Sequence, residues 1–325
     1  MRAIVWTKYG SADGLQLREL AKPVPKDNEV LIRINAATVS TADCELRSSN
    51  TFSIFWLPMR LYIGLFRPIR VKVLGQELAG EIETTGKAVS MFRSGDQVFA
   101  WSGFRLGANA EYICLPETGV LTTKPSNMTY EEAATLPIGG LEAVHFLKKG
   151  MLRSGQKVLI NGAGGSIGTF AIQIARSFGA EVTAVDSAEK LDMMGSIGAE
   201  RVIDFAREDF TQSGERYDVI FDVIGKSSFS GSIRSLKQNG RYLLGNPGLS
   251  QRLQASRFSG NGKKVIPYSS RSAGEIAEDL NYLKELIESG KVKAIIDRLY
   301  LLEQTAEAHR YVEAGHKKGS VVITV

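Results

Sequence analysis

The residues best equipped for chemistry lie in one glycine-rich stretch, "KVLINGAGGSIGTFAIQIARSFGAEVTAVD" (157–186). An apolar run predicts a buried strand, a turn rich in glycine follows, and apolar residues at helical spacing lead to a second strand. Glycines let the backbone turn tightly and let a pyrophosphate approach the following helix, whose free N–H groups and dipole favour negative charge. The order of strand, turn, helix and strand therefore predicts dinucleotide binding.

The glycine spacing departs from the strict GxGxxG pattern, because Ile167 stands where the third glycine would fall. The spacing that fits is GxxGxxG, which is one residue longer. A glycine-rich turn that serves only helix–strand packing is the alternative, but the complete strand order favours nucleotide binding. We expect the nucleotide to contact the turn and the first helical residues, namely Gly162, Gly165, Ser166, Ile167 and Gly168.

The end of the second strand bears on which nucleotide binds. Asp186 stands where a carboxylate binds the adenosine ribose hydroxyls of NAD. Ser187 and Lys190 follow at once, and both suit the 2′-phosphate of NADP. An exposed lysine at a helix start is the alternative for Lys190. The two signals conflict, and we expect NADPH to be favoured over NAD.

The rest of the chain supplies the elements that position these residues. After Pro125 strand-forming runs alternate with helical segments, which predicts an α/β fold with a doubly wound parallel sheet of six strands. Thr129 and Glu132 have the spacing of a capping box at the first of these helices. The runs lie at 157–161, 181–186, 201–205, 217–224, 241–246 and 263–268.

The first ~125 residues are rich in short strands without long helices, which favours a barrel or a sandwich. The final segment, 319–325, also predicts a strand, and we expect it to rejoin the N-terminal β domain. The predicted domains are therefore 1–124 with 271–325, and 125–270.

Composition sets the broad class. The 325 residues suit two domains, and 43% hydrophobic with 23% charged residues is typical of a globular enzyme. The net charge of +5 is spread along the chain except in "QRLQASRFSGNGKK" (251–264), which holds no acid. This stretch predicts either a solvated loop or a loop that faces an anionic ligand. No recognition motif accompanies it, so nucleic-acid binding is not expected.

Cysteine usage and hydropathy indicate the compartment. Cys44 and Cys114 form no CxxC motif and no disulfide framework, and no charged-then-apolar leader is present, so we expect a cytoplasmic protein. The apolar stretch 55–69 is interrupted by two arginines and two prolines, and it is shorter than the ~20 residues that span a bilayer. We expect it to form a loop and helix near a binding cleft, or part of the core, and no membrane association is expected.

The whole chain resembles the medium-chain dehydrogenase/reductase superfamily. The motifs that carry the resemblance are the glycine-rich stretch described above, "GQELAGEI" (75–82), "GDQVFA" (95–100), "LPIGGLEAVHFL" (136–147) and "RYLLGN" (241–246). The resemblance is greatest to its zinc-free, quinone oxidoreductase-like branch. It implies a GroES-like β-barrel domain, a six-stranded Rossmann domain and a cleft between them that holds NAD(P)H.

The resemblance also bears on metal binding. Zinc-dependent relatives carry a cysteine at the position of Ser40, a histidine at that of Gln76 and a third ligand near Ile138. A catalytic zinc needs three protein ligands, normally histidine, cysteine or carboxylate, and these three residues do not supply them. The four-cysteine structural zinc lobe is also missing. The resemblance therefore implies a zinc-independent enzyme.

The loss of zinc changes which reaction is reasonable. Alcohol oxidation develops an alkoxide, which a zinc ion stabilises by several kcal/mol. Hydride addition to a conjugated enone or quinone spreads charge to an oxygen that hydrogen-bond donors can stabilise, each by roughly 3 kcal/mol. We expect Ser40, or a water held near Gln76, to donate to that oxygen, and Asp43 and Glu77 to fix loops. The zinc-free relatives often have asparagine at the Ser40 position and threonine at that of Glu142, near the nicotinamide.

The same resemblance implies that Ile224, Gly225, Gly245 and Asn246 line the cofactor, with strand-end turn chemistry as the alternative. Aromatic residues of the stretch 48–66 are expected to line the substrate path or to belong to the core. These aromatic residues are Phe55, Trp56, Tyr62 and Phe66.

The predicted function is an NAD(P)H-dependent reductase of quinones or α,β-unsaturated carbonyls. Two alternatives stay open: a cofactor-binding sensor or partner protein with little turnover, and a zinc-type alcohol dehydrogenase. The stretch "KKVIPYS" (263–269) predicts an exposed edge strand, and such strands invite pairing with a second copy, so a homodimer is expected.

Overall fold

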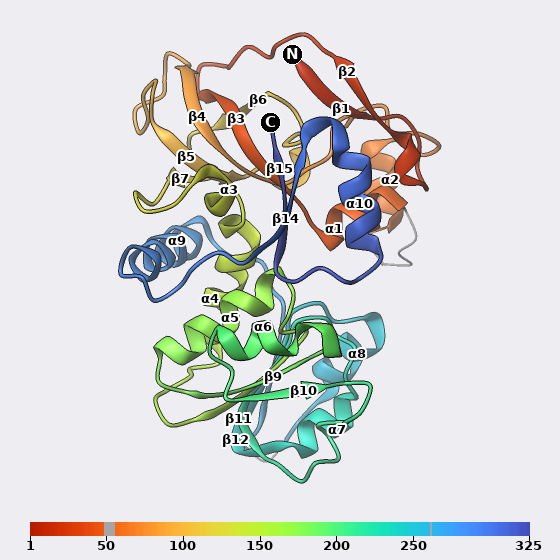
Figure 1. Cartoon of the computed structure of the whole chain (residues 1–325), viewed down its shortest axis with the longest axis vertical. Helices are drawn as coiled ribbons and strands as arrows, with labels where there is room; N and C mark the ends of the chain where they lie inside the picture. Colours follow the sequence, from red (N-terminus) through yellow and green to blue (C-terminus); the bar gives the residue numbers. More distant parts are fainter. Residues whose placement is uncertain (49–55, 261) are drawn as a thin grey trace. The chain divides into compact units, whose positions relative to one another are not determined.

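A computed structural model describes residues 1–48, 56–260 and 262–325, which form two compact units (Figure 1). The first unit holds residues 1–138 and 296–325, so both chain ends belong to it. The second unit holds residues 139–295.

The first unit is built on a seven-stranded sheet. Its longest strand, β3 (Glu29–Val39), pairs with β4 (Glu77–Thr85) on one side, and with β6 (Tyr112–Pro116) and β15 (Ser320–Thr324) on the other. The C-terminal strand thus rejoins the N-terminal sheet, as predicted. The remaining strands are β5 (Gln97–Trp101), β7 (Val120–Thr123) and β14 (Ile296–Leu301), while β1 (Arg2–Trp6) and β2 (Leu15–Glu19) form a separate antiparallel pair.

These strands enclose one apolar core. β3 is buried along nearly its whole length because both of its faces meet apolar side chains. Trp6, Ile32 and Leu78, all under 3% exposed, lie in this core with residues of β5, β6 and β15. A barrel-type β domain of this kind was predicted, whereas β7 was not, since Val120 to Thr123 is short and follows β6 closely.

The helices of the first unit are short. α1 (Thr41–Ser48) packs against α10 (Thr305–Glu313), and the two lie side by side in Figure 1. Between them, the fully buried Arg47 donates from Nε to Nδ1 of His309 at 3.4 Å, and Cys44 Sγ lies 3.4 Å from the same nitrogen. The unit also contains α2 (Trp56–Ile63) and α3 (Tyr130–Ala133), whose predicted capping box between Thr129 and Glu132 is present.

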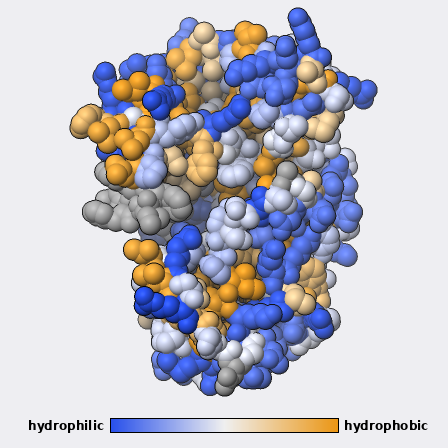
Figure 2. Space-filling view, turned by 180° about the vertical axis from the view of Figure 1, so that it is seen from behind, coloured by the Kyte–Doolittle hydropathy of each residue, from blue (hydrophilic) through white to orange (hydrophobic). Residues whose placement is uncertain are grey.

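The segment around α2 was predicted to form either a loop and helix near a binding cleft or part of the core, and the structure contradicts the second alternative. Ile63 is buried, but Leu61 is 59% and Phe66 88% exposed, so most of this segment does not belong to the core. Figure 2 shows hydrophobic surface here, on the left of the view next to the grey residues. Phe55 lies outside the described residues. No helix in the described part of the chain is long and apolar enough to cross a membrane.

The second unit contains a six-stranded sheet in the order β10-β9-β8-β11-β12-β13, and every pairing is parallel. This order is the one expected of a doubly wound dinucleotide-binding sheet, with β8 and β11 at the point where the order reverses. The strands are β8 (Lys157–Asn161), β9 (Glu181–Asp186), β10 (Arg201–Asp204), β11 (Tyr217–Asp222), β12 (Leu236–Leu244) and β13 (Lys264–Pro267).

Helices connect most of these strands. They are α4 (Leu141–Lys149), α5 (Ser166–Ser177), α6 (Leu191–Ser196), α7 (Phe229–Arg234), α8 (Leu249–Arg257) and α9 (Ala273–Glu288). α4 lies before β8 and α9 after β13, but turns and not the predicted helix join β10 to β11. A π-helical turn, Leu136–Gly140, precedes α4, and single 3₁₀ turns occupy Ala12–Gly14, Gly103–Arg105, Ala188–Lys190 and Leu302–Gln304.

Two predictions need correction here. The basic stretch 251–264 was expected to be a loop, but its first half is helical, because α8 runs to Arg257. The unit limits fall at 138/139 and 295/296 instead of 124/125 and 270/271. The reason is packing: α3 contacts β3, β4 and β15 of the first unit, whereas α9 contacts α4 of the second.

Candidate active site

The glycine turn between β8 and α5 has the geometry of a phosphate-binding loop. Gly162 has φ +81°, and a Cβ there would lie 2.6 Å from Cγ2 of Ile224. A Cβ on Gly168 would overlap the Gly162 carbonyl oxygen, so the first turn of α5 sits directly on the loop. The spacing of these two glycines with Gly165 is the GxxGxxG spacing chosen from the sequence.

The start of α5 is left open. Gly165 is the N-cap residue and offers no side chain to the helix, and the nearest atom to a Cβ built on it is 3.7 Å away. The first amides of a helix have no carbonyl partner within the helix, so those of Ile167 and Gly168 can donate hydrogen bonds to an anion. Ser166 and Ile167 are half-buried at this position.

Asp186, Ser187 and Lys190 come together beside the turn. Lys190 Nζ lies 2.9 Å from Asp186 Oδ1, and both side chains are about nine-tenths buried. The other carboxylate oxygen accepts from the Gly164 N–H at 2.9 Å, and Oδ1 also accepts from the Ser187 N–H at 2.8 Å. The reading of Lys190 as an exposed lysine is therefore wrong, because its stem packs over Gly164, where a Cβ would lie 2.5 Å from Lys190 Cδ.

The loops that follow β11 and β12 meet at the same sheet edge. Ile224 is 41% exposed and covers Gly162. Gly225 has φ +64°, and a Cβ there would overlap the carbonyl oxygen of Asn246. The Gly245 N–H donates to the Asp222 carbonyl at 2.9 Å. Of the four residues predicted to line the cofactor, Ile224 contacts the glycine turn, and Gly225, Gly245 and Asn246 lie together in the loops beside it.

In the first unit, Ser40 and Gln76 lie at the same end of one strand pair. β3 and β4 are antiparallel with Ala37 opposite Leu78, and Ser40 follows β3 while Gln76 precedes β4. Ser40 Oγ donates to Asp43 Oδ2 at 2.6 Å and accepts from the Asp43 N–H at 3.2 Å, which caps α1. Gln76 Nε2 donates only weakly, to the Gly103 carbonyl at 3.3 Å.

The two neighbouring acids hold the backbone in place. Burial raises the pKa of the Asp43 carboxyl, although the Ser40 hydroxyl and amide both donate to it. Glu77, 4% exposed, accepts from Thr38 Oγ1 at 2.5 Å and from the Ile138 N–H at 2.7 Å. The loop-fixing roles expected of Asp43 and Glu77 agree with these bonds.

One of these bonds joins the segments of Gln76 and Ile138, two of the three positions at which zinc-dependent relatives are expected to carry ligands. Ile138 bonds to Glu77, the neighbour of Gln76, yet the side chains of Ser40, Gln76 and Ile138 are poor zinc ligands. Among residues 1–48, 56–260 and 262–325, no three histidine, cysteine, aspartate or glutamate side chains form a group that could hold a metal.

Glu142 has a partner that the sequence did not suggest. Arg271, 5% exposed, forms an ion pair with Glu142 Oε1, while Glu142 Oε2 is buried without a hydrogen bond. Burial raises the pKa of the Glu142 carboxyl, and the Arg271 charge opposes this. Arg271 lies 129 positions away, so only the fold brings the two together.

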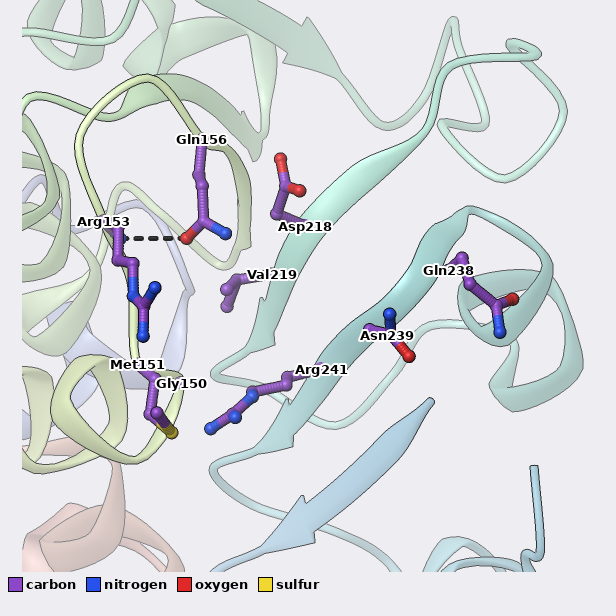
Figure 3. Close-up of a pocket in the computed structure, with 9 residues that line it drawn as sticks. All are labelled: Gly150, Met151, Arg153, Gln156, Asp218, Val219, Gln238, Asn239 and Arg241. Atoms are coloured by element: carbon purple, nitrogen blue, oxygen red, sulfur yellow. Dashed lines mark hydrogen bonds between the residues drawn. The ribbon is translucent and has the colours of Figure 1, made fainter. Parts of the chain in front are cut away.

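A small pocket in the second unit lies at the other edge of the sheet. Figure 3 shows Arg153 and Gln156 from the loop before β8 facing side chains from the start of β11 and from β12. The Gln156 side chain accepts from the Arg153 amide at 2.9 Å. Since the glycine turn follows the carboxyl ends of the strands, this pocket is not part of the candidate site.

Comparison with known proteins agrees with the fold. Residues 26–126 match the family described as "Alcohol dehydrogenase GroES-like domain", and residues 197–323 match "Zinc-binding dehydrogenase". The solved structure of a quinone oxidoreductase from Coxiella burnetii superimposes with a TM-score of 0.88 at 26% identity, over 100% of this chain and 99% of that one.

Two plant relatives are similar along nearly the whole chain. One is 2-methylene-furan-3-one reductase of Solanum lycopersicum, 30% identical over 99% of this chain and 79% of its own length. The other is a chloroplastic NADPH-dependent alkenal/one oxidoreductase of Arabidopsis thaliana, 30% identical over the same shares.

A GroES-like β domain joined to a dinucleotide-binding sheet defines the class of nicotinamide-dependent oxidoreductases. Within that class, the chain belongs to the medium-chain dehydrogenase/reductase superfamily, in its quinone oxidoreductase-like branch. The family and the fold predicted from the sequence are both confirmed.

Proposed function

We propose that this protein is an NAD(P)H-dependent reductase of quinones or α,β-unsaturated carbonyls that works without zinc. The observation that carries the proposal is the open, glycine-lined start of α5 at the carboxyl edge of the parallel sheet. The names of the relatives, an alkenal/one oxidoreductase and a furanone reductase, support the acceptor class.

The nucleotide fits the residues of the second unit. Gly165 leaves the start of α5 open, while Gly162 and Gly168 let the turn pack closely against Ile224 and α5, and the amides of Ile167 and Gly168 would hold the pyrophosphate. When bound, the dihydronicotinamide supplies the hydride. Ile224, Gly225, Gly245 and Asn246 would line and orient the nucleotide.

The Asp186–Lys190 pair favours NADPH over NADH. Asp186 already accepts from Gly164, Ser187 and Lys190, so it has little capacity left for ribose hydroxyls. Lys190 neutralises the carboxylate that would repel a 2′-phosphate, and its ammonium and the Ser187 hydroxyl can donate to that phosphate. The name of the Arabidopsis relative includes NADPH dependence, which supports this preference.

Ser40 and Gln76 are the proposed donors to the acceptor oxygen. Ser40 already shares its proton with Asp43, a carboxyl whose pKa burial raises, so the pair can pass a proton to a developing enolate or quinol oxygen. Gln76 makes one long hydrogen bond and can hold a water in reach of the same oxygen. Neither residue, nor Ile138, suits zinc, which supports a metal-free reaction.

The assembly and compartment complete the proposal. β13 is an edge strand of the six-stranded sheet, which supports pairing with a second copy through this edge. The lack of a cysteine framework supports a cytoplasmic location.

The direct test is turnover. Purified protein should oxidise NADPH in the presence of a quinone and enone panel, with saturation in both substrates. Tight NADPH binding without turnover on any acceptor would contradict the reductase and favour the sensor alternative.

A further inference from the structure

Asp222, at the carboxyl end of β11, is a fully buried acid with an unusual set of partners. Its Oδ1 accepts from Asn161 Nδ2 at 2.9 Å and from the Gly225 N–H at 3.0 Å. Its Oδ2 accepts from Ser227 Oγ at 2.5 Å, from the Ser227 N–H at 3.3 Å and from the Tyr242 hydroxyl at 3.0 Å. Five donors therefore converge on one carboxyl group.

All of these donors are neutral. Three are N–H groups, which only donate, so both oxygens serve as acceptors, as they do in an ionised carboxylate. Within the described ranges of the second unit, no lysine or arginine forms an ion pair with Asp222. Hydrogen bonds, and no ion pair, stabilise this buried negative charge.

The donors join three neighbouring elements. Asn161 ends β8, Tyr242 belongs to β12, and Gly225 and Ser227 lie in the loop after β11. Between Asp222 and Gly225 stands Ile224, which packs over Gly162 of the glycine turn. The carboxylate thus fixes the 223–228 loop against the turn while remaining out of contact with solvent.

The position of this charge matters because of the nucleotide's own charge. A dinucleotide crosses the sheet edge where the strand order reverses, between β8 and β11, and Asp222 ends β11. The oxidised nicotinamide carries one positive charge that the reduced ring lacks. At an effective dielectric of about 20, a unit charge some 10 Å away changes an equilibrium between two such charge states by roughly tenfold.

We propose that Asp222 is a positioning residue of the nucleotide site, and that its charge, which is held by hydrogen bonds without an ion pair, makes the site prefer oxidised over reduced nucleotide. This inference rests on the proposed function, because it assumes that a nicotinamide nucleotide binds at this edge. Asp222 touches neither nucleotide nor substrate. It acts through the loop that it fixes and through its field.

The test compares the dissociation constants of NADP⁺ and NADPH by calorimetry. In Asp222→Asn, the preference for NADP⁺ over NADPH should fall about three- to tenfold relative to the unmodified protein. Tyr242→Phe is the matched control, since it removes one donor and keeps the charge. It should weaken both nucleotides by a similar factor and leave the ratio unchanged.

Equal effects of Asp222→Asn on the two nucleotides, or none, would overturn the charge assignment. An unchanged affinity in Tyr242→Phe and in Ser227→Ala would overturn the positioning role. If Asp222→Asn does not fold, Ile224→Lys adds an opposing charge at an exposed position of the same loop and should shift the ratio in the same direction. An unshifted ratio there would also contradict the inference. Failure of the unmodified protein to bind either nucleotide would instead defeat the proposed function.

Discussion

Lys190 Nζ lies 2.9 Å from Asp186 Oδ1 beside the glycine turn, and both side chains are about 10% exposed. The sequence suggested opposite roles for these two residues, an acid for NAD and a cation for NADP. The structure makes them partners, so the acid is neutralised where a 2′-phosphate would approach.

Replacing Lys190 by methionine keeps the stem over Gly164 and removes the charge. We expect the dissociation constant of NADPH to rise roughly 10- to 100-fold, the loss of a charge-assisted hydrogen bond of about 1.5–3 kcal/mol. NADH affinity should hold or improve, because Asp186 becomes free for ribose hydroxyls. Paired titrations with both nucleotides measure this.

Lys237→Met is the control for that substitution. Lys237 pairs with Asp218 at 2.7 Å, next to the pocket of Figure 3 at the opposite edge of the sheet. This variant should leave both dissociation constants unchanged. An unaltered NADPH affinity in Lys190→Met would refute the phosphate assignment.

Substitutions of Ser40 and Gln76 should differ in their effect on the free energy of unfolding. Ser40→Ala removes the cap of α1 and should cost about 1 kcal/mol of unfolding free energy, whereas Gln76→Ala loses one long hydrogen bond and should cost little. If both donate to the acceptor oxygen, each variant lowers kcat roughly 100-fold or more. Ser40→Thr retains the hydroxyl and should recover most of the rate. Variants with wild-type kcat would remove these residues from the mechanism.

His309 predicts an acid sensitivity of the first unit. Burial, and then the Arg47 charge, lower its pKa from 6.5 to about 3. Below pH 6.5, His309 binds a proton in the unfolded chain but not in the folded protein. Its contribution to the free energy of unfolding is therefore fully present above pH 6.5 and is lost as the pH falls toward 3. The slope approaches 1.4 kcal/mol per pH unit.

Urea unfolding at several pH values measures this slope. His309→Gln should flatten it, while the exposed His316→Gln should retain it. Equal slopes in the unmodified protein and His309→Gln would mean that other groups control the acid response.

The edge strand β13 predicts the assembly. Light scattering should give twice the 35.5 kDa chain mass. Proline at Val265 or at Ile266 removes an N–H, and alternate residues of a strand point their N–H groups toward β12 or outward. One variant should therefore unfold locally and the other should become a folded monomer. If both proline variants are folded dimers, the contact between the two copies does not lie at β13.

Much of this architecture was predictable because apolar runs and glycines report local structure. β8, α5 and β9 follow from the strand, turn and helix pattern, and parallel strands necessarily deliver the loops at Gly162, Ile224 and Gly245 to one edge. The relevant physical signals are short-range, so a single sequence carries them.

Other features depend on tertiary packing that the sequence does not encode locally. Lys190 turns inward only because Gly164 has no side chain, and Arg271 reaches Glu142 from far along the chain. Asp222 was visible as an acid within the apolar run "YDVIFDVI" (217–224), yet its donors come from three separate segments. The exposure of Phe66 likewise contradicted its apolar character.

The central claim is that a nicotinamide nucleotide bound at the glycine turn reduces a conjugated acceptor without zinc. The most direct measurement is NADPH oxidation by protein stripped of metal with a chelator and checked by metal analysis, using a quinone and an enone as acceptors. We predict full turnover without added metal, and loss of nucleotide binding in Gly165→Asp. Turnover that appears only when zinc is restored, or nucleotide binding that survives Gly165→Asp, would contradict the account.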